Sequence, residues 1–239
     1  MSDDGAESRR RLLEERYAEL AAFAGGLAHE IKNPLSTLNL NLQLLAEDFQ
    51  AAENQKERRA LEKIGRLQQV VERLEGLLND FLRFARVERL NLRPTALKDL
   101  VEEIVDFYGP QAAAKNIVLR SDVNDGLPMV SLDRDLFKQA LFNLLLNAQH
   151  AMPSGGELIL RGRTGDGRVR LSIIDTGVGI KPDAKDKIFE PFFSTRSGGS
   201  GLGLPTAKRI VDAHDGKLSV ESVLGQGTAF TIDLPAARP

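Results

Sequence analysis

The apolar residues in the first third of the chain repeat with the spacing of two long helices. From Leu13 to Phe49 they recur at alternating steps of three and four, which is a heptad pattern. A second pattern of this kind runs from Ile64 to Ala85, and residues 50–59 between the two are polar. The segments are therefore predicted to form an antiparallel helical hairpin. One hairpin cannot cover both apolar stripes, so a homodimer with a four-helix bundle is expected.

The first of these patterns has a fault. Its step from Ile31 to Leu35 is one residue too long, and Pro34 lies inside that step. Proline removes a backbone hydrogen bond and bends a helix axis. The first helix is therefore predicted to bend near Pro34.

Beyond residue 93 the pattern changes to alternating helix-like and strand-like segments separated by glycine-rich stretches. The chain is therefore predicted to be α + α/β. An N-terminal segment over 1–19 continues the heptads, a hairpin occupies 20–88, and an α+β domain of ordinary size occupies 94–236. Helices are expected at 98–114, 133–151 and 203–214, and strands at 116–123, 156–163, 168–175, 217–222 and 227–234.

The composition excludes several classes of function. The 239 residues carry a net charge of -2, whereas nucleic-acid binders usually show a strong basic excess, so no nucleic-acid partner is expected. The chain has no cysteine, which excludes thiolate chemistry and is compatible with a reducing cytoplasm. No apolar run approaches the roughly 20 residues of a membrane helix, and residues 1–11 do not resemble a signal peptide. A cytoplasmic protein is expected.

His29 is a candidate nucleophile on the first helix. At about 100° per residue it points away from the apolar stripe that includes Leu27 and Ile31, so it is predicted to face solvent. A neutral imidazole can attack a phosphoryl group if a base accepts its proton, and Glu30 is the adjacent carboxylate. Asn33 lies one turn further on the same face, where its amide could orient a water. A surface histidine is usually only solvated, so this assignment requires a phosphoryl donor site elsewhere in the chain.

Two asparagines in the second domain indicate a ligand or metal. Asn143 and Asn147 are four residues apart on one face of an otherwise apolar helix, and His150 lies one turn beyond them. Amide oxygens are hard ligands that suit Mg²⁺, which also takes phosphate oxygens. The pair could instead bridge neighbouring elements, so both interpretations stay open at this point.

A strand end followed by glycines is a second candidate for ligand binding. Asp175 ends an apolar strand, and Gly177 and Gly179 follow it. A buried carboxylate there could accept a hydrogen bond from an exocyclic amine such as that of adenine, while the glycines allow a ligand to approach the backbone. The sequence GQGT at 225–228 is, by itself, only a tight turn.

A glycine-rich segment before the last helix is a candidate phosphate site. Glycines at 198, 199, 201 and 203 precede that helix, whose N-terminal amides and dipole would attract an anion. Phe189, Phe192 and Phe193 lie between Gly179 and these glycines, which is typical of a hinged lid. Arg196 is placed to neutralise phosphate charge.

Taken in order, these segments resemble the catalytic core of the sensor histidine kinases of two-component systems. HEIKNP resembles the H box, the helix with the two asparagines the N box, DTGVGI the G1 box, the phenylalanines the F box and GGSGLGL the G2 box. Within that family, the sequences HEIKNP and GLGLPTAKRIV most resemble sensor kinases of the nitrogen-regulation type. The resemblance implies a dimeric phosphoacceptor hairpin and an α/β-sandwich ATP-binding domain of the kind also found in gyrase and Hsp90-type chaperones.

The resemblance also implies roles for the candidate residues. His29 would take a phosphoryl group from ATP with Glu30 as its base, and would pass it to an aspartate of a response-regulator receiver domain. Asn33 would serve in dephosphorylating that regulator, and Asn147 would bind Mg²⁺ beside Asn143. The residues implied to bind ATP are Asn143, Asn147, His150, Asp175, Gly177, Gly179, Ile180, Phe189, Arg196, Gly199, Gly201, Leu202, Gly203 and Thr228.

Two alternatives come from other classes of protein. A nucleotide-driven ATPase would need a carboxylate near the two asparagines to activate water, and Asp135 is too many turns back for that. A non-catalytic dimeric scaffold would show a damaged nucleotide site, whereas these motifs are intact. One position departs from the family, since Asp215 stands where glycine is frequent.

Overall fold

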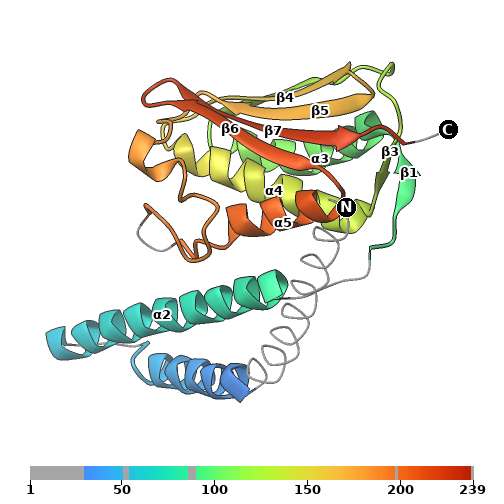
Figure 1. Cartoon of the computed structure of the whole chain (residues 1–239). Helices are drawn as coiled ribbons and strands as arrows, with labels where there is room; N and C mark the ends of the chain where they lie inside the picture. Colours follow the sequence, from blue (N-terminus) through green and yellow to red (C-terminus); the bar gives the residue numbers. More distant parts are fainter. Residues whose placement is uncertain (1–29, 51–53, 86–89, 197–198, 238–239) are drawn as a thin grey trace. The chain divides into compact units, whose positions relative to one another are not determined.

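The computed structural model describes residues 30–50, 54–85, 90–196 and 199–237 (Figure 1). The chain divides into two compact units, Met1–Glu88 with Arg196–Ser200 and Arg89–Thr195 with Gly201–Pro239. His29 and the predicted segment over 1–19 lie outside the described residues. Over the described ranges, no helix is both long enough and apolar enough to cross a membrane.

The first unit contains the two predicted helices. One covers the described residues 30–48 and continues across Pro34, and α2 spans Gln55–Ala85. Leu42 packs with Ile64 and Val71 of α2 in a small apolar core. The hairpin is confirmed, while the predicted bend involves residues before 30 and stays a prediction.

Helix α2 begins earlier than the apolar pattern indicated, so the prediction of a polar connection over 50–59 is wrong in its second half. Asn54 explains the early start. Its Oδ1 accepts from the backbone N–H groups of Lys56 and Glu57, both at 3.0 Å, and its Nδ2 donates to the Glu57 carboxylate at 2.5 Å. This is an N-cap that resembles a capping box, except that Glu57 accepts from the side-chain amide of Asn54 rather than from its backbone N–H. The polar residues after Asn54 are therefore the solvated first turns of a helix.

The isolated hairpin leaves much of its apolar surface uncovered. Leu42, Ile64 and Val71 are its buried residues in the small core, although the helices carry many more large apolar side chains. Surface of this extent normally marks an interface with another protein. The exposed members are Ile31, Leu38, Leu40, Leu44, Leu45, Leu67, Val70 and Leu74.

We expect Asn54→Ala to loosen the start of α2. Loss of an N-cap costs about 1 kcal/mol, which corresponds to roughly fivefold faster local opening. Hydrogen exchange of peptides covering the first turn of α2 measures this. Asn54→Ser keeps a capping oxygen without adding a charge beside Glu57 and should exchange nearly like the wild type, whereas equal exchange in all three proteins would contradict the role of the cap.

The second unit is built on a five-stranded sheet. Neighbouring strands are antiparallel except β2 and β4, which are parallel. A short antiparallel ribbon, β1 (Arg93–Thr95) with β3 (Val130–Leu132), lies beside the sheet. In spatial order the sheet strands are β2 (Ile117–Asp122), β4 (Gly156–Gly165), β5 (Arg168–Asp175), β7 (Gly227–Pro235) and β6 (Lys217–Val223).

Three helices cover one face of this sheet (Figure 1). They are α3 (Leu97–Ala113), α4 (Arg134–Ala151) and α5 (Gly203–Ala213), and a 3₁₀ turn, η1, spans Pro182–Ala184. Alternate residues of the strands point toward the helices, and with the apolar helix faces they form a continuous core. This gives the two-layer sandwich that the resemblance implied.

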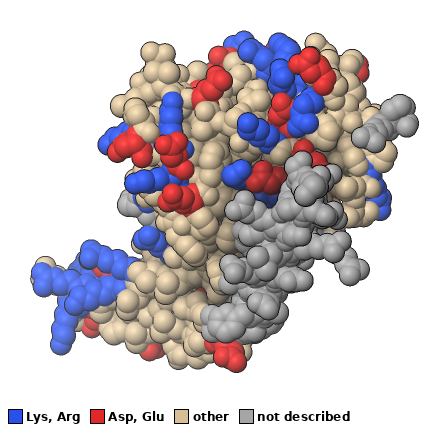
Figure 2. Space-filling view, viewed as in Figure 1, with Lys and Arg blue, Asp and Glu red and all other residues tan. Residues whose placement is uncertain are grey.

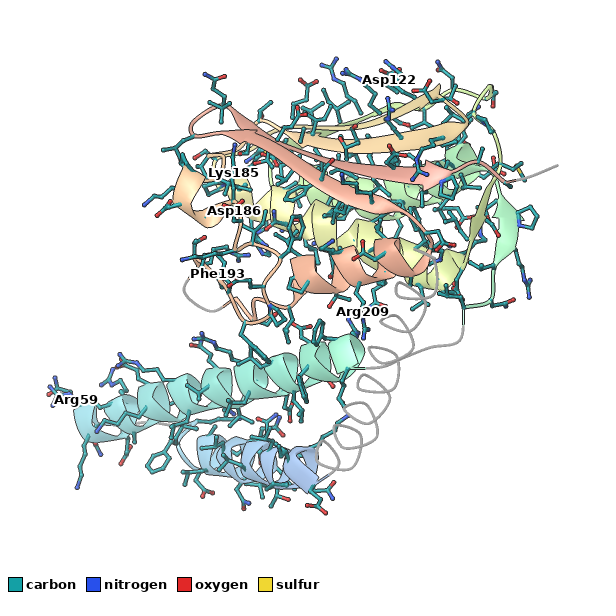
Figure 3. All side chains as sticks on the ribbon, in the orientation of Figure 1. Arg59, Asp122, Lys185, Asp186, Phe193 and Arg209 are labelled. Carbon is teal, nitrogen blue, oxygen red and sulfur yellow. The ribbon has the colours of Figure 1, made fainter. Side chains whose placement is uncertain are left out.

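The other face of the sheet is open and carries paired charges. Asp122 forms ion pairs with Arg161 and Arg163, and Asp233 with Arg168 and Arg170. Figure 2 shows basic and acidic side chains interspersed there, and Figure 3 shows Asp122 on this outer side. Because both signs alternate, this face resembles an ordinary solvated surface.

Most predicted elements of the second unit are confirmed within two residues, but the ribbon strands β1 and β3 were not predicted. Each has only three residues, too few for a period-2 pattern to be visible. The structure also explains why the family frequently has glycine where this chain has Asp215. Its φ is 55°, a left-handed conformation just after α5 that glycine adopts most easily and aspartate tolerates.

Candidate nucleotide-binding site

Helix α4 presents the two predicted asparagines. Its N-cap is Asp133, whose Oδ1 accepts from the Leu136 N–H at 3.2 Å. The apolar face of α4 is buried in the core, whereas Asn143 and Asn147 are half-buried along another side, and His150 is exposed in the last turn. The two amides therefore lie at the border between core and solvent, where their oxygens can reach a ligand.

The loop after β5 packs against the C-terminal end of α4. The Val178 N–H donates to the carbonyl of Ala151 at 3.0 Å. A Cβ added to Gly177 would lie 2.6 Å from that same carbonyl oxygen, so a side chain does not fit there. Glycine at 177 thus lets the loop with Asp175 approach the asparagine helix.

Asp175 is a buried carboxylate with one oxygen in use. Only 2% of the residue is exposed, and its Oδ1 accepts from the Gly177 N–H at 2.9 Å. Its Oδ2 has no hydrogen-bond partner within the described part of the chain. Burial raises the pKa of Asp175, although backbone hydrogen bonds from Gly177 and Thr228 oppose the rise. A buried acceptor without a donor is costly, so this atom is suited to a ligand N–H.

Ser222 of β6 is a site residue that the sequence analysis missed. Its Oγ accepts from the Ile180 N–H at 2.8 Å, donates to the Gly227 carbonyl at 2.9 Å and lies 3.0 Å from the Thr228 hydroxyl. The hydroxyl thereby joins the loop after β5 to the start of β7. A signal was present, because Ser222 is a polar residue on the inward, apolar side of an alternating strand.

The turn at 225–228, which the sequence indicated only as a tight turn, is required for the close approach of β7 to Asp175. Asp175 pairs with Thr228 across β5 and β7, and Thr228 is buried. Gly227 has a φ of 108°, and a Cβ there would collide with the Asp175 carbonyl. Gly179 likewise has a φ of 68°, and a Cβ would collide with the Val223 carbonyl. The loop and the turn can approach this closely only because both positions are glycine.

The start of α5 lies beside the asparagine helix. Leu202 is the buried N-cap of α5, and its carbonyl accepts the first hydrogen bond of the helix from the Thr206 N–H at 2.9 Å. A Cβ on Gly203 would be 3.7 Å from the Asn143 Oδ1, so the N-terminal turn of α5 and this amide border the same space. Exposed N–H groups at a helix start favour an anion. The structure thus brings the predicted phosphate element next to the predicted Mg²⁺ element.

The three phenylalanines of the predicted lid do not act as one cluster. Phe189 packs edge-on against Phe230 in the core, with 6.4 Å between ring centroids. Phe193 is also partly buried against the core, on the segment before α5 (Figure 3). Phe192 is 66% exposed, has a φ of 65°, and its N–H donates to the Gly201 carbonyl at 3.1 Å.

Four predicted residues are not joined to this site by the structure. Arg196 and Gly199 fall outside the compact unit that holds the sheet. Glu30 and Asn33 are exposed on the first helix, where the prediction placed them. Their roles, like that of His29, remain predictions.

Comparison with known proteins shows to which family this chain belongs. Residues 132–238 match the family of histidine kinase-, DNA gyrase B- and HSP90-like ATPases, and residues 19–90 match the His Kinase A (phospho-acceptor) domain. A solved catalytic domain of the histidine kinase ThkA is 30% identical, with a TM-score of 0.56. The likeness covers 62% of this chain and 99% of that domain. The chain belongs to the sensor histidine kinase family.

Longer members of the family agree with this assignment. The sensor histidine kinase ZraS of Salmonella typhi is 32% identical over 234 residues, covering 95% of this chain and 49% of that protein. The full-length structure of ShkA in complex with AMPPNP has a TM-score of 0.71 at 30% identity, covering 92% of this chain and 47% of that one. The chain thus spans about half the length of the curated relatives it matches.

We expect Ser222→Ala to destabilise the domain built on the five-stranded sheet. The change leaves the Ile180 N–H without its partner, which costs about 1–3 kcal/mol for a buried group. Urea unfolding of the full chain measures the loss. Ser219→Ala on the exposed side of the same strand is the matched control and should change stability by less than about 0.5 kcal/mol. Equal stability of the two variants would contradict the bridging role of Ser222.

Proposed function

We propose that this chain is an ATP-dependent protein-histidine kinase that phosphorylates His29 and passes the phosphoryl group to an aspartate of a response regulator. The observation that carries the proposal is the Oδ2 of the buried Asp175, which has no hydrogen-bond partner among the described residues. Asp175 lies on the loop that contacts the end of α4, and Asn143 of the same helix lies beside the start of α5. This order suits a nucleotide, with an exocyclic amine at one end and phosphates at the other.

The residues present fit ATP and Mg²⁺. Asp175 would accept from the adenine amine, and Thr228 and Ile180 belong to the wall around it. Asn147 would ligate Mg²⁺ beside Asn143, because amide oxygens are among the hard ligands this ion takes. When bound, Mg²⁺ would neutralise charge on the phosphates.

His29 would carry the transferred group. An imidazole nitrogen of His29 would form a bond to the γ-phosphorus as the bond from that phosphorus to the ADP oxygen breaks, so ADP leaves with the electron pair. The proton on the other imidazole nitrogen would pass to Glu30, the adjacent carboxylate. Asn33, on the same exposed helix face, would orient the water that dephosphorylates the regulator.

The proposal includes two protein partners. The exposed leucines of the hairpin support a homodimer, because a second copy offers the same apolar stripe and can complete a four-helix bundle. The regulator would be a separate receiver-domain protein. ThkA, one of the structural relatives, has been solved in complex with the response regulator TrrA.

A water-activating ATPase is the weaker candidate. The part of α4 that carries Asn143 and Asn147 contains no carboxylate from residue 139 onward. Asp135 precedes Asn143 by eight residues, or about 12 Å along a helix, so it is too far away to activate a water at the asparagines.

His29→Gln should abolish labelling of the chain by γ-labelled ATP. In the wild-type chain the label should be lost in acid and retained in alkali, as expected for phosphohistidine rather than for a phosphoester. The variant should still bind ATP, because the nucleotide residues lie in the other domain. Equal labelling of variant and wild type would overturn the proposal.

Asp175→Asn should weaken ATP binding by at least about tenfold, because an amide replaces a charged acceptor. It should not reduce the stability of the unliganded chain. Burial raises the pKa of Asp175, so wild-type stability falls as the pH rises from its ordinary value of 3.8 to the folded value, and the variant lacks this decline.

Calorimetry with Mg-ATP and urea unfolding between pH 4 and 7 measure both effects of Asp175→Asn. Asp166→Asn in the β4–β5 turn is the control, because Asp166 is exposed and asparagine tolerates its φ of 55°. Unchanged ATP affinity in Asp175→Asn would contradict the assignment of the base pocket.

A further inference from the structure

The N-cap of α4 has a carboxylate oxygen that capping does not need. The Asp133 Oδ1 accepts from the Leu136 N–H at 3.2 Å, and its carbonyl accepts from the Phe137 N–H at 2.9 Å. These two bonds are sufficient for an N-cap, and serine or threonine makes them with a single side-chain oxygen. The second oxygen, Oδ2, is therefore available for a separate contact.

That contact is with the connection between the two domains. The Asp133 Oδ2 accepts from the backbone N–H of Asn91 at 2.9 Å. Asn91 follows the end of α2 at Ala85 and precedes the β1–β3 ribbon, whose pairing begins at Arg93 and Leu132. Among the described residues of the connection, the hydrogen bond at Asn91 therefore lies closer along the chain to the hairpin than the pairing of β1 with β3, which starts at Arg93.

Asp133 is also contacted by His214, the C-cap residue of α5. Its N–H donates to Nε2 of His214 at 3.0 Å, while Nδ1 of His214 lies 2.7 Å from the Ile210 carbonyl. Both contacts are satisfied only by a neutral ring with its proton on Nδ1. His214 is 4% exposed and packs edge-on against Phe137, with 5.7 Å between centroids. The residue that holds the connection is therefore itself held by both α4 and the end of α5.

Three segments that serve the proposed reaction meet at this residue. Helix α4 carries Asn143 and Asn147, and α5 begins beside Asn143 at Gly203 and ends at the His214 contact. The connection leads to the hairpin that carries His29. Asp133 thus contacts the connection at Asn91, caps α4 and is contacted by the end of α5, so it joins the connection to the two helices that border the phosphate site.

We propose that Asp133 is a positioning residue for phosphoryl transfer, which it serves by fastening the connection at Asn91 to helix α4. The inference rests on the proposed kinase function. Donor and acceptor lie on different domains of the chain, so their effective concentration depends on how far the connection can wander. Removing the Asn91 bond leaves the pairing of β1 with β3 as the attachment of the described part of the connection, without altering a residue that would touch ATP.

Asp133→Ser is the variant that separates the two roles of the carboxylate. Serine keeps the capping oxygen but cannot serve Leu136 and Asn91 together. Asn91→Pro removes the same hydrogen bond from the other side, since proline has no N–H. Asp135→Ser is the matched control, because it removes a carboxylate from the same first turn of α4 at an exposed position.

The measurements are the affinity for Mg-ATP by calorimetry, the thermal midpoint, and the rate of His29 labelling at saturating ATP. In Asp133→Ser and Asn91→Pro we expect the labelling rate to fall by about tenfold, because misplaced reacting groups carry a rate penalty of at least this size. The affinity for Mg-ATP and the midpoint should stay within the range of Asp135→Ser.

Three outcomes would overturn the inference. Labelling of Asp133→Ser at the rate of Asp135→Ser would show that the bond does not position the domains. A loss of ATP affinity in parallel with the rate would show that Asp133 acts through the shape of α4 alone. Absence of label on His29 in the wild-type chain would overturn the proposed function and this inference together, whereas the first two outcomes leave the proposed function standing.

Discussion

Burial of one face of the five-stranded sheet is the constraint on which the nucleotide site depends. The strands alternate apolar and polar residues, and α3, α4 and α5 cover the apolar side. Because α4 and α5 must both lie on this face, the amide of Asn143 and the first turn of α5 come side by side. The loop after β5 contacts the end of α4 at Ala151, which places Asp175 near the same helix. The site is thus formed by packing, and its polar residues occupy the border of the core.

In the hairpin, by contrast, much of the apolar surface stays uncovered within one chain. Two helices bury only a small core around Leu42, and several leucines that follow the heptad pattern stay exposed. A sheet domain covers its apolar face within one chain, whereas a two-helix unit has no third layer to do so. This difference is why the proposed homodimer concerns the hairpin rather than the ATP-binding domain.

Long periodic segments were predicted well from the sequence, and short or locally determined features were not. Heptads and period-2 alternation extend over many residues, so both helices of the hairpin and all five sheet strands were predicted. The start of α2 was missed because it depends on one capping side chain, Asn54, within a polar stretch. Ser222 was missed because its role exists only when β6, the loop after β5 and the start of β7 are adjacent. The phenylalanines were grouped by sequence proximity, but Phe189 and Phe192 have different environments in the structure.

By itself, the sequence determined the two-part architecture, the helix and strand periods, and the residue types able to bind a nucleotide. Those properties are local, because periodicity and side-chain chemistry can be read from neighbours along the chain. Only the tertiary structure decided that the Asp175 Oδ2 lacks a partner among the described residues, that Gly227 must be glycine, and that Asp133 binds Asn91, which precedes it by 42 residues. These facts depend on distances between segments far apart in the sequence, and packing of the whole domain sets those distances.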